Sequence, residues 1–164
     1  MKILFYFKFF GTTFLLGKTV EELYGDRIEL LGIAFKDPLV LCQIFIAIFL
    51  IIVFLQSSID KIIDRKGNLD FFKVHFAKTM INNFSQYLLT IITIFELTGS
   101  LTLIYGVYYA FAEKTTLWIF YGFVILSVTL LFLLLGQRLA KDYTGAADLV
   151  PYFVLIMLGI MSMY

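Results

Sequence analysis

Residues 39–58 read LVLCQIFIAIFLIIVFLQSS, an apolar run that contains neither a charge nor a proline. Its length matches the roughly 20 residues that an α-helix needs to cross the hydrocarbon core of a bilayer. Asp37 and Pro38 precede the run, and a proline in the first turn is typical of a helix start. This stretch therefore predicts a transmembrane helix.

Three further apolar runs follow. Residues 87–112 contain one carboxylic acid, residues 117–135 contain none, and residues 149–164 form a shorter run with a proline in its first turn. A membrane helix satisfies its own backbone hydrogen bonds, as lipid requires. The sequence therefore predicts an all-α fold, an integral membrane four-helix bundle over residues 39–164.

The composition agrees with a membrane environment. Hydrophobic residues make up 61% of the chain and charged residues only 15%, whereas a soluble domain is about half apolar and a quarter charged. With 19 Phe and 10 Tyr, a soluble fold would expose more apolar surface than water tolerates. The net charge of +1 lacks the basic field that nucleic-acid binding needs, so we expect no nucleic-acid partner.

Single copies of cysteine and histidine limit the chemistry. Cys42 has no partner in the chain for a disulfide or a CxxC pair, and it is expected to be a small buried residue. One histidine, His75, is too few for a haem pair or a histidine-based metal site. We therefore expect no bound metal and no covalently bound cofactor.

Residues 1–38 are expected to form an N-terminal interfacial segment. Aromatic clusters alternate there with Lys2, Lys8, Lys18 and the pair Glu21-Glu22, a pattern that favours one or more helices lying on the membrane surface. A strained fifth span over residues 4–16 is the alternative. Because Lys8 interrupts that stretch and no small-x-small cleavage site follows, the segment is expected to be retained.

The two longer connections are polar. In residues 59–86, Gly67 and Asn68 predict a turn, with Asn68 capping a short helix whose Leu69, Phe72 and Phe76 share one face. Residues 136–148 are expected to be a polar, glycine-containing connection. Seven basic residues lie on this side of the spans, and six lie on the other if the N-terminal segment does not cross the membrane, which leaves the membrane orientation open.

Charged and amide side chains are expected to meet at one end of the bundle. Both connections lie on the same membrane face, because the first and third spans end where the second and fourth begin. Residues four apart share a helical face, which pairs polar positions within each helix end. We therefore predict one ligand-binding cluster of six residues: Gln56, Asp60, Glu96, Gln137, Arg138 and Asp142.

Glu96 is the central member, about 14 Å inside its span at 1.5 Å per residue. An acid at that depth costs several kcal/mol unless it is paired or neutral, so it is expected to face other helices. Gly99, Leu103 and Gly106 continue the same stripe and allow close helix approach. Two roles remain open: a structural anchor that is protonated or bonded to Thr or Tyr side chains, or a ligand-binding or proton-handling acid.

Arg138 and His75 each allow two interpretations. We expect Arg138 to pair internally with Asp60 or Asp142, and snorkelling to lipid headgroups is the alternative. His75 is expected at the membrane interface, with proton transfer as its alternative role.

Three motifs carry a family resemblance: FLQSSIDK at 54–61, FELTGS at 95–100 followed by Gly106, and GQRLAKDY at 136–143. In order and spacing, residues 39–164 resemble the DoxX-like family of small four-helix membrane proteins. The resemblance implies an accessory membrane subunit, similar to the small subunit of thiosulfate:quinone oxidoreductase.

Two functions therefore stand as expectations. The first is an accessory subunit of a larger membrane complex, whose partners are other membrane protein subunits and lipids. The second is a quinone-linked oxidoreductase component with Glu96, Asp60 and Arg138 around the quinone headgroup. A transporter is disfavoured, because four short spans without repeats do not match transporter architecture. The expected location is the bacterial inner (cytoplasmic) membrane.

Overall fold

The computed structural model describes residues 28–30, 33–35, 38–77, 79, 81–113 and 115–163. The chain divides into two units, residues 1–42 and 43–164, and each is described by itself. In the first, β1 (Ile28–Leu30) and β2 (Ile33–Phe35) form an antiparallel hairpin with Glu29 opposite Ala34.

At residues 28–30 and 33–35 the structure has strands within the segment that was expected to form one or more interfacial helices. In the sequence a glycine, Gly32, stands between the two strands, a composition that is typical of hairpins. The possible fifth span at residues 4–16 lies outside the described residues.

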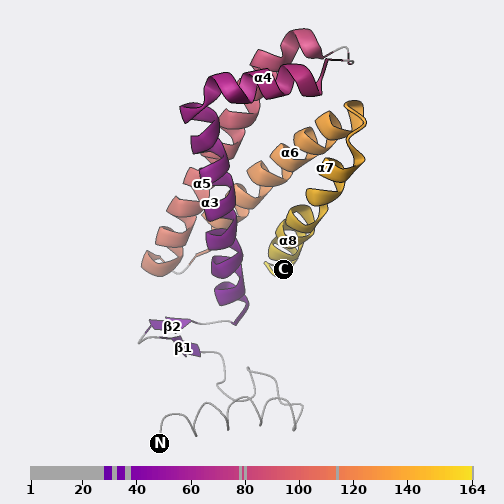
Figure 1. The fold of residues 1–164 in the computed structure, drawn as a ribbon. Coiled ribbons are helices and arrows are strands. Elements are labelled where there is room, and N and C mark those ends of the chain that lie inside the picture. The colour runs from indigo at the N-terminus through magenta and orange to yellow at the C-terminus, as the bar shows by residue number, and fades with distance from the viewer. Residues whose placement is uncertain are drawn as a thin grey trace, which may run out of the picture. The chain divides into compact units, whose positions relative to one another are not determined.

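The second unit is the membrane bundle (Figure 1). Its helices are α3 (Pro38–Ile63), whose first five residues belong to the first unit, α4 (Arg65–His75), η1 (Asn82–Phe84), α5 (Ser85–Ala112), α6 (Leu117–Leu139), α7 (Tyr143–Asp148) and α8 (Val150–Met161). Four helical stretches are long and apolar enough to cross a membrane: Leu39–Ile63, Asn82–Ala112, Leu117–Leu139 and Tyr143–Met161. The prediction of four membrane-spanning helices is confirmed.

Helix ends differ from the predicted ones. α3 and α6 each continue about one turn past the predicted ends, because a helix does not stop where the first polar side chain appears. Gly136, Gln137 and Arg138 therefore lie in the last turn of α6 and not in a loop. The polar connection after α6 is shorter than predicted, and α7 begins at Tyr143.

α4 has the predicted apolar face but a different cap. Phe72 and Phe76 are buried together, with Leu69 packed against them. The N-cap is Asp64, whose Oδ1 accepts a hydrogen bond of 3.0 Å from the backbone N–H of Gly67. Asn68 lies inside the helix, so the predicted turn at Gly67-Asn68 and the Asn68 cap were wrong. Asp64 is as good a cap and lies closer to the end of α3.

α5 and α6 approach most closely along the predicted small-residue stripe. A Cβ added at Gly106 would lie 2.7 Å from the backbone nitrogen of Ile119, and one at Gly122 would overlap the side chain of Leu103. Glu96, Gly99, Leu103 and Gly106 are all buried, as predicted. From this close contact the two helices separate toward the end of the bundle at which α4 lies (Figure 1).

α3 buries one helical face toward the bundle. Ile44, Ala47, Leu50 and Phe54 recur at helical spacing and are at most 4% exposed. On the same face, Gln43 Nε2 donates a hydrogen bond of 2.9 Å to the carbonyl oxygen of Ser162 at the end of α8. Cys42 is exposed, contrary to the expectation, because the position is rotated away from this face.

Large apolar side chains on the outer faces of the spans should be shielded by lipid. Single cysteines at Phe45, Ile94 and Val128, all exposed on α3, α5 and α6, are expected to resist a membrane-impermeant maleimide in native membranes. Cysteines at the exposed polar positions Lys66 and Asp148 are the controls and should be labelled readily from their accessible side. Cys42 is replaced by alanine in all variants. Rapid labelling at any of the three apolar positions would contradict its assignment to a lipid-facing surface.

Candidate functional site

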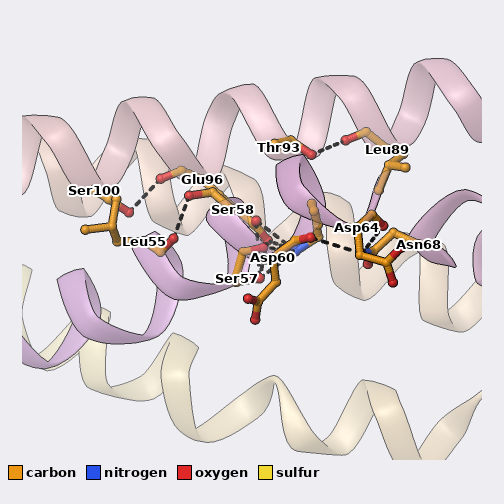
Figure 2. A network of polar contacts seen from close by, with 11 residues as sticks. Leu55, Ser57, Ser58, Asp60, Asp64, Asn68, Leu89, Thr93, Glu96 and Ser100 are labelled. Atoms are coloured by element: carbon orange, nitrogen blue, oxygen red, sulfur yellow. Dashed lines mark hydrogen bonds and ion pairs between the residues drawn. The ribbon is translucent and has the colours of Figure 1, made fainter. Parts of the chain in front are cut away.

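A buried ion pair joins α3 to α5. Lys61 Nζ donates to both carboxylate oxygens of Glu96, at 3.1 Å to Oε1 and 2.9 Å to Oε2. Ser57, one turn before Lys61, donates from Oγ to the same carboxylate at 3.3 Å and accepts a hydrogen bond from Lys61 Nζ. Figure 2 shows Ser57 and Glu96 in this polar network between the two helices. The side chains of Lys61 and Glu96 are 12% and 2% exposed.

This arrangement satisfies both charges. The Glu96 carboxylate receives hydrogen bonds from an ammonium group and a hydroxyl, and the pair is neutral as a whole. A buried pair of this kind balances its desolvation cost only when its geometry is good and its remaining hydrogen bonds are made. In this state Glu96 anchors α3 to α5, and its partners are Lys61 and Ser57, not the Thr or Tyr side chains expected.

The sequence contains a pattern from which Ser57 and Lys61 could have been predicted as the partners of Glu96. Ser57 and Lys61 are four residues apart and therefore lie on one face of α3. Lys61 is also the only basic residue of α3, and a buried acid on the neighbouring helix needs a cation within reach.

A second polar group lies where α4 meets the end of α6. His75 Nε2 is 2.8 Å from Oε1 of Gln137 and 4.0 Å from Oδ2 of Asp142. Asp142 is the N-cap of α7, because its Oδ1 accepts a hydrogen bond of 2.9 Å from the backbone N–H of Gly145. A Cβ added at Gly145 would lie 2.5 Å from Asp142 Oδ2 and 2.8 Å from Gln137 Nε2. The absence of a side chain at Gly145 therefore lets the turn close tightly around both side chains.

An apolar cavity of about 410 Å³ is lined by residues of both polar groups. It lies among α4, α5 and α6, where α5 and α6 have diverged, and its walls include four phenylalanines: Phe71, Phe72, Phe76 and Phe132. Its polar lining comes from Lys61, His75 and Gln137. Volumes of about 300–1,000 Å³ with apolar walls and few polar groups are usual for sites that bind small molecules. The cavity therefore joins the two polar groups into one candidate site.

The six predicted residues are only partly brought together. Gln137 and Asp142 meet at His75, and Glu96 reaches the cavity wall through Lys61. Gln56 and Asp60 are exposed on α3, do not line this cavity, and drop out of the candidate site. The residues that the prediction missed are Ser57, Lys61 and His75.

Arg138 does not make the predicted internal ion pair. It is exposed, and its Cζ lies 4.7 Å from the centroid of the Tyr143 ring, a cation–π geometry. Among the described residues no carboxylate lies within ion-pairing distance of it. Because Gln137 occupies the inward position at the end of α6, the next residue is rotated out of the cavity.

Within the described part of the chain, no group of three or more His, Cys, Asp or Glu side chains could hold a metal ion. The candidate site therefore consists of aromatic walls, one buried ion pair and one histidine–amide–carboxylate group. No protein-family model, curated protein or solved structure matches this chain.

Proposed function

We propose that this protein is an accessory integral membrane subunit of a larger membrane complex, and that its contribution is a quinone-binding site in the cavity among α4, α5 and α6. The observation that carries the proposal is the cavity itself. It combines aromatic walls with polar groups from Lys61, His75 and Gln137. A quinone has the matching chemistry, because its flat ring suits aromatic walls, and its oxygens accept hydrogen bonds as carbonyls and donate them as the hydroxyls of the reduced form.

The surroundings of the cavity support the same ligand class. The imidazole of His75 stacks on Phe71 with centroids 5.4 Å apart and an interplanar angle of 22°. A planar ring can extend such a stack, whereas a flexible fatty acyl chain gains little from it. The charge of Lys61 is already neutralised by Glu96, so the site favours a neutral headgroup over an anionic one.

The proposed role as a subunit rests on the absence of residues for an electron-transfer centre in the sequence. A single cysteine and a single histidine provide no electron-transfer centre of their own. Electrons that reach a bound quinone would therefore come from a partner protein. The resemblance to DoxX-like proteins agrees with this role, and with it we propose the bacterial inner membrane as the location.

Filling the cavity should remove the quinone. Gly136 lines the cavity, and a Cβ added there would lie 3.4 Å from Phe76, an ordinary contact. Gly136→Ala is therefore expected to retain the ligand, whereas the larger side chain of Gly136→Leu should occupy its space. Protein purified gently from its native membrane is extracted, and quinone is quantified per protein against a detergent blank. We expect a clear excess in the wild type and Gly136→Ala, and about a tenfold loss in Gly136→Leu, the effect of roughly 1.4 kcal/mol in affinity.

The same preparations test the subunit role. Stoichiometric membrane partners identified by mass spectrometry would support an accessory subunit, and quinone retained by the isolated chain would support a component that binds it alone. A wild-type quinone content no higher than the detergent blank, or equal contents in both Gly136 variants, would contradict the proposed site.

A further inference from the structure

The environment of His75 is asymmetric, and this asymmetry assigns its protons. Gln137 Oε1 can only accept a hydrogen bond, so the 2.8 Å contact requires that His75 Nε2 donates. The carboxylate of Asp142, 4.0 Å from the same nitrogen, also favours a proton there. Neutral His75 is therefore held as the Nε2–H tautomer.

This tautomer leaves Nδ1 with a free lone pair. Nδ1 makes no hydrogen bond to any described residue, although the ring lines the cavity and its side chain is only 17% exposed. The ring is held in place by Phe71, on which it stacks, and by Phe76, which it meets edge-on with centroids 5.0 Å apart. A fixed imidazole with an unused acceptor is suited to take a proton from a hydroxyl group.

Asp142 completes the arrangement. Its Oδ2 lies 4.0 Å from His75 Nε2, which places an acidic side chain next to the imidazole. The other charged side chain at the cavity is Lys61, whose charge is balanced by Glu96. Arg138 is turned toward Tyr143, outside the cavity. Asp142 is 34% exposed, so the pair extends from the cavity to the outer surface.

We propose that His75 is the proton-exchanging residue of the cavity, for a ligand of the hydroquinone class. The ligand hydroxyl donates a hydrogen bond to Nδ1; its O–H bond then breaks, the electron pair stays on the ligand oxygen, and the proton forms an N–H bond at Nδ1. The resulting imidazolium lies 4.0 Å from the carboxylate of Asp142, which is 34% exposed and offers the proton a way to solvent. This inference rests on the proposed quinone site and names the residue that handles its proton.

The single histidine of the chain makes this assignment directly measurable. Protein labelled with ¹⁵N-histidine, and purified with a tag that contains no histidine, gives signals from one imidazole only. At alkaline pH the empty protein should show a directly bonded proton at Nε2 and none at Nδ1. A proton found predominantly at Nδ1 would overturn the inference.

Two matched probes separate hydroxyl donors from carbonyl acceptors. The compound 2-methyl-1-naphthol carries a hydroxyl where menadione has a carbonyl, and neither requires an electron donor. The naphthol should move the Nδ1 signal toward its protonated position, and menadione should alter the ring environment without doing so. Equal effects of the two probes on Nδ1 would overturn the role of His75. If neither probe disturbs His75 while the Nε2–H tautomer persists, the proposed quinone site fails instead.

A charge-removing variant tests the role of Asp142. Asp142→Asn keeps an N-cap of equal quality for α7 and removes only the negative charge beside the ring. Without the carboxylate that favours a proton at Nε2, a larger share of the neutral rings should carry the proton at Nδ1. The control Asp60→Asn removes an exposed carboxylate that does not line the cavity, and it should leave the two tautomers in their wild-type proportion. Equal tautomer proportions in the Asp142 and Asp60 variants would exclude the carboxylate–imidazole pair.

Discussion

Replacing Lys61 with methionine is expected to lower the free energy of unfolding by about 3 kcal/mol, the usual cost of leaving one buried charge without its partner. Methionine keeps much of the length and apolar character of the lysine stem, so the decrease in the free energy of unfolding measures the effect of removing the ammonium charge. Glu96 is then left in an apolar helix interface with only the Ser57 hydroxyl as a donor. Denaturant titration in mixed micelles, followed by the fluorescence of the single tryptophan, measures the effect.

The partner substitution should cost less. In Glu96→Gln the lysine loses its counter-charge, but Lys61 lies near the end of α3, and its long side chain can reach toward the headgroups. The double variant Lys61→Met/Glu96→Gln should be more stable than Lys61→Met alone, because no buried charge remains unpaired. Lys66→Met, at an exposed position of α4, is the control and should change stability by no more than about 0.5 kcal/mol. A Lys61 variant as stable as this control would refute an energetically important ion pair.

A methyl group at Gly106 is expected to destabilise the α5–α6 hairpin by about 2–3 kcal/mol, within the range for overpacking a tight contact. The added Cβ of Gly106→Ala would lie 2.7 Å from the backbone nitrogen of Ile119 and 2.9 Å from the carbonyl carbon of Trp118. Backbone atoms cannot move aside by changing a rotamer, so the two helices must separate. Alanine favours a helix over glycine by about 1 kcal/mol, and the expected loss is net of that gain.

Alanine substitutions at two other glycines provide stability changes with which the Gly106→Ala loss can be compared. A Cβ at Gly99 would meet the side chain of Leu126, which is flexible, so Gly99→Ala should cost less than Gly106→Ala. Gly136→Ala has room for its methyl group and should be neutral or slightly stabilising, because only the helix preference acts. The same denaturant titration ranks the three variants. If Gly106→Ala were as stable as Gly136→Ala, the close approach of α5 and α6 would be contradicted.

The sequence by itself determined the four spans and the inward orientation of Glu96. Both follow from local patterns: the length of each apolar run, and the spacing of Gly99 and Gly106 on the stripe of Glu96. These patterns act within a single helix, where the rise and rotation per residue are fixed. The apolar face of α4, with Phe72 and Phe76, was predictable for the same reason.

Only the tertiary structure decided which side chains meet. Glu96 pairs with Lys61 and not with Arg138, because contact between helices depends on their relative rotation and offset along the axis, which no single helix encodes. One residue turns a helical position by about 100°, enough to put Gln137 in the cavity wall and Arg138 on the surface. The cavity has the same origin. Small residues hold α5 and α6 together at one end, the helices diverge from there, and α4 brings His75 to the space between them.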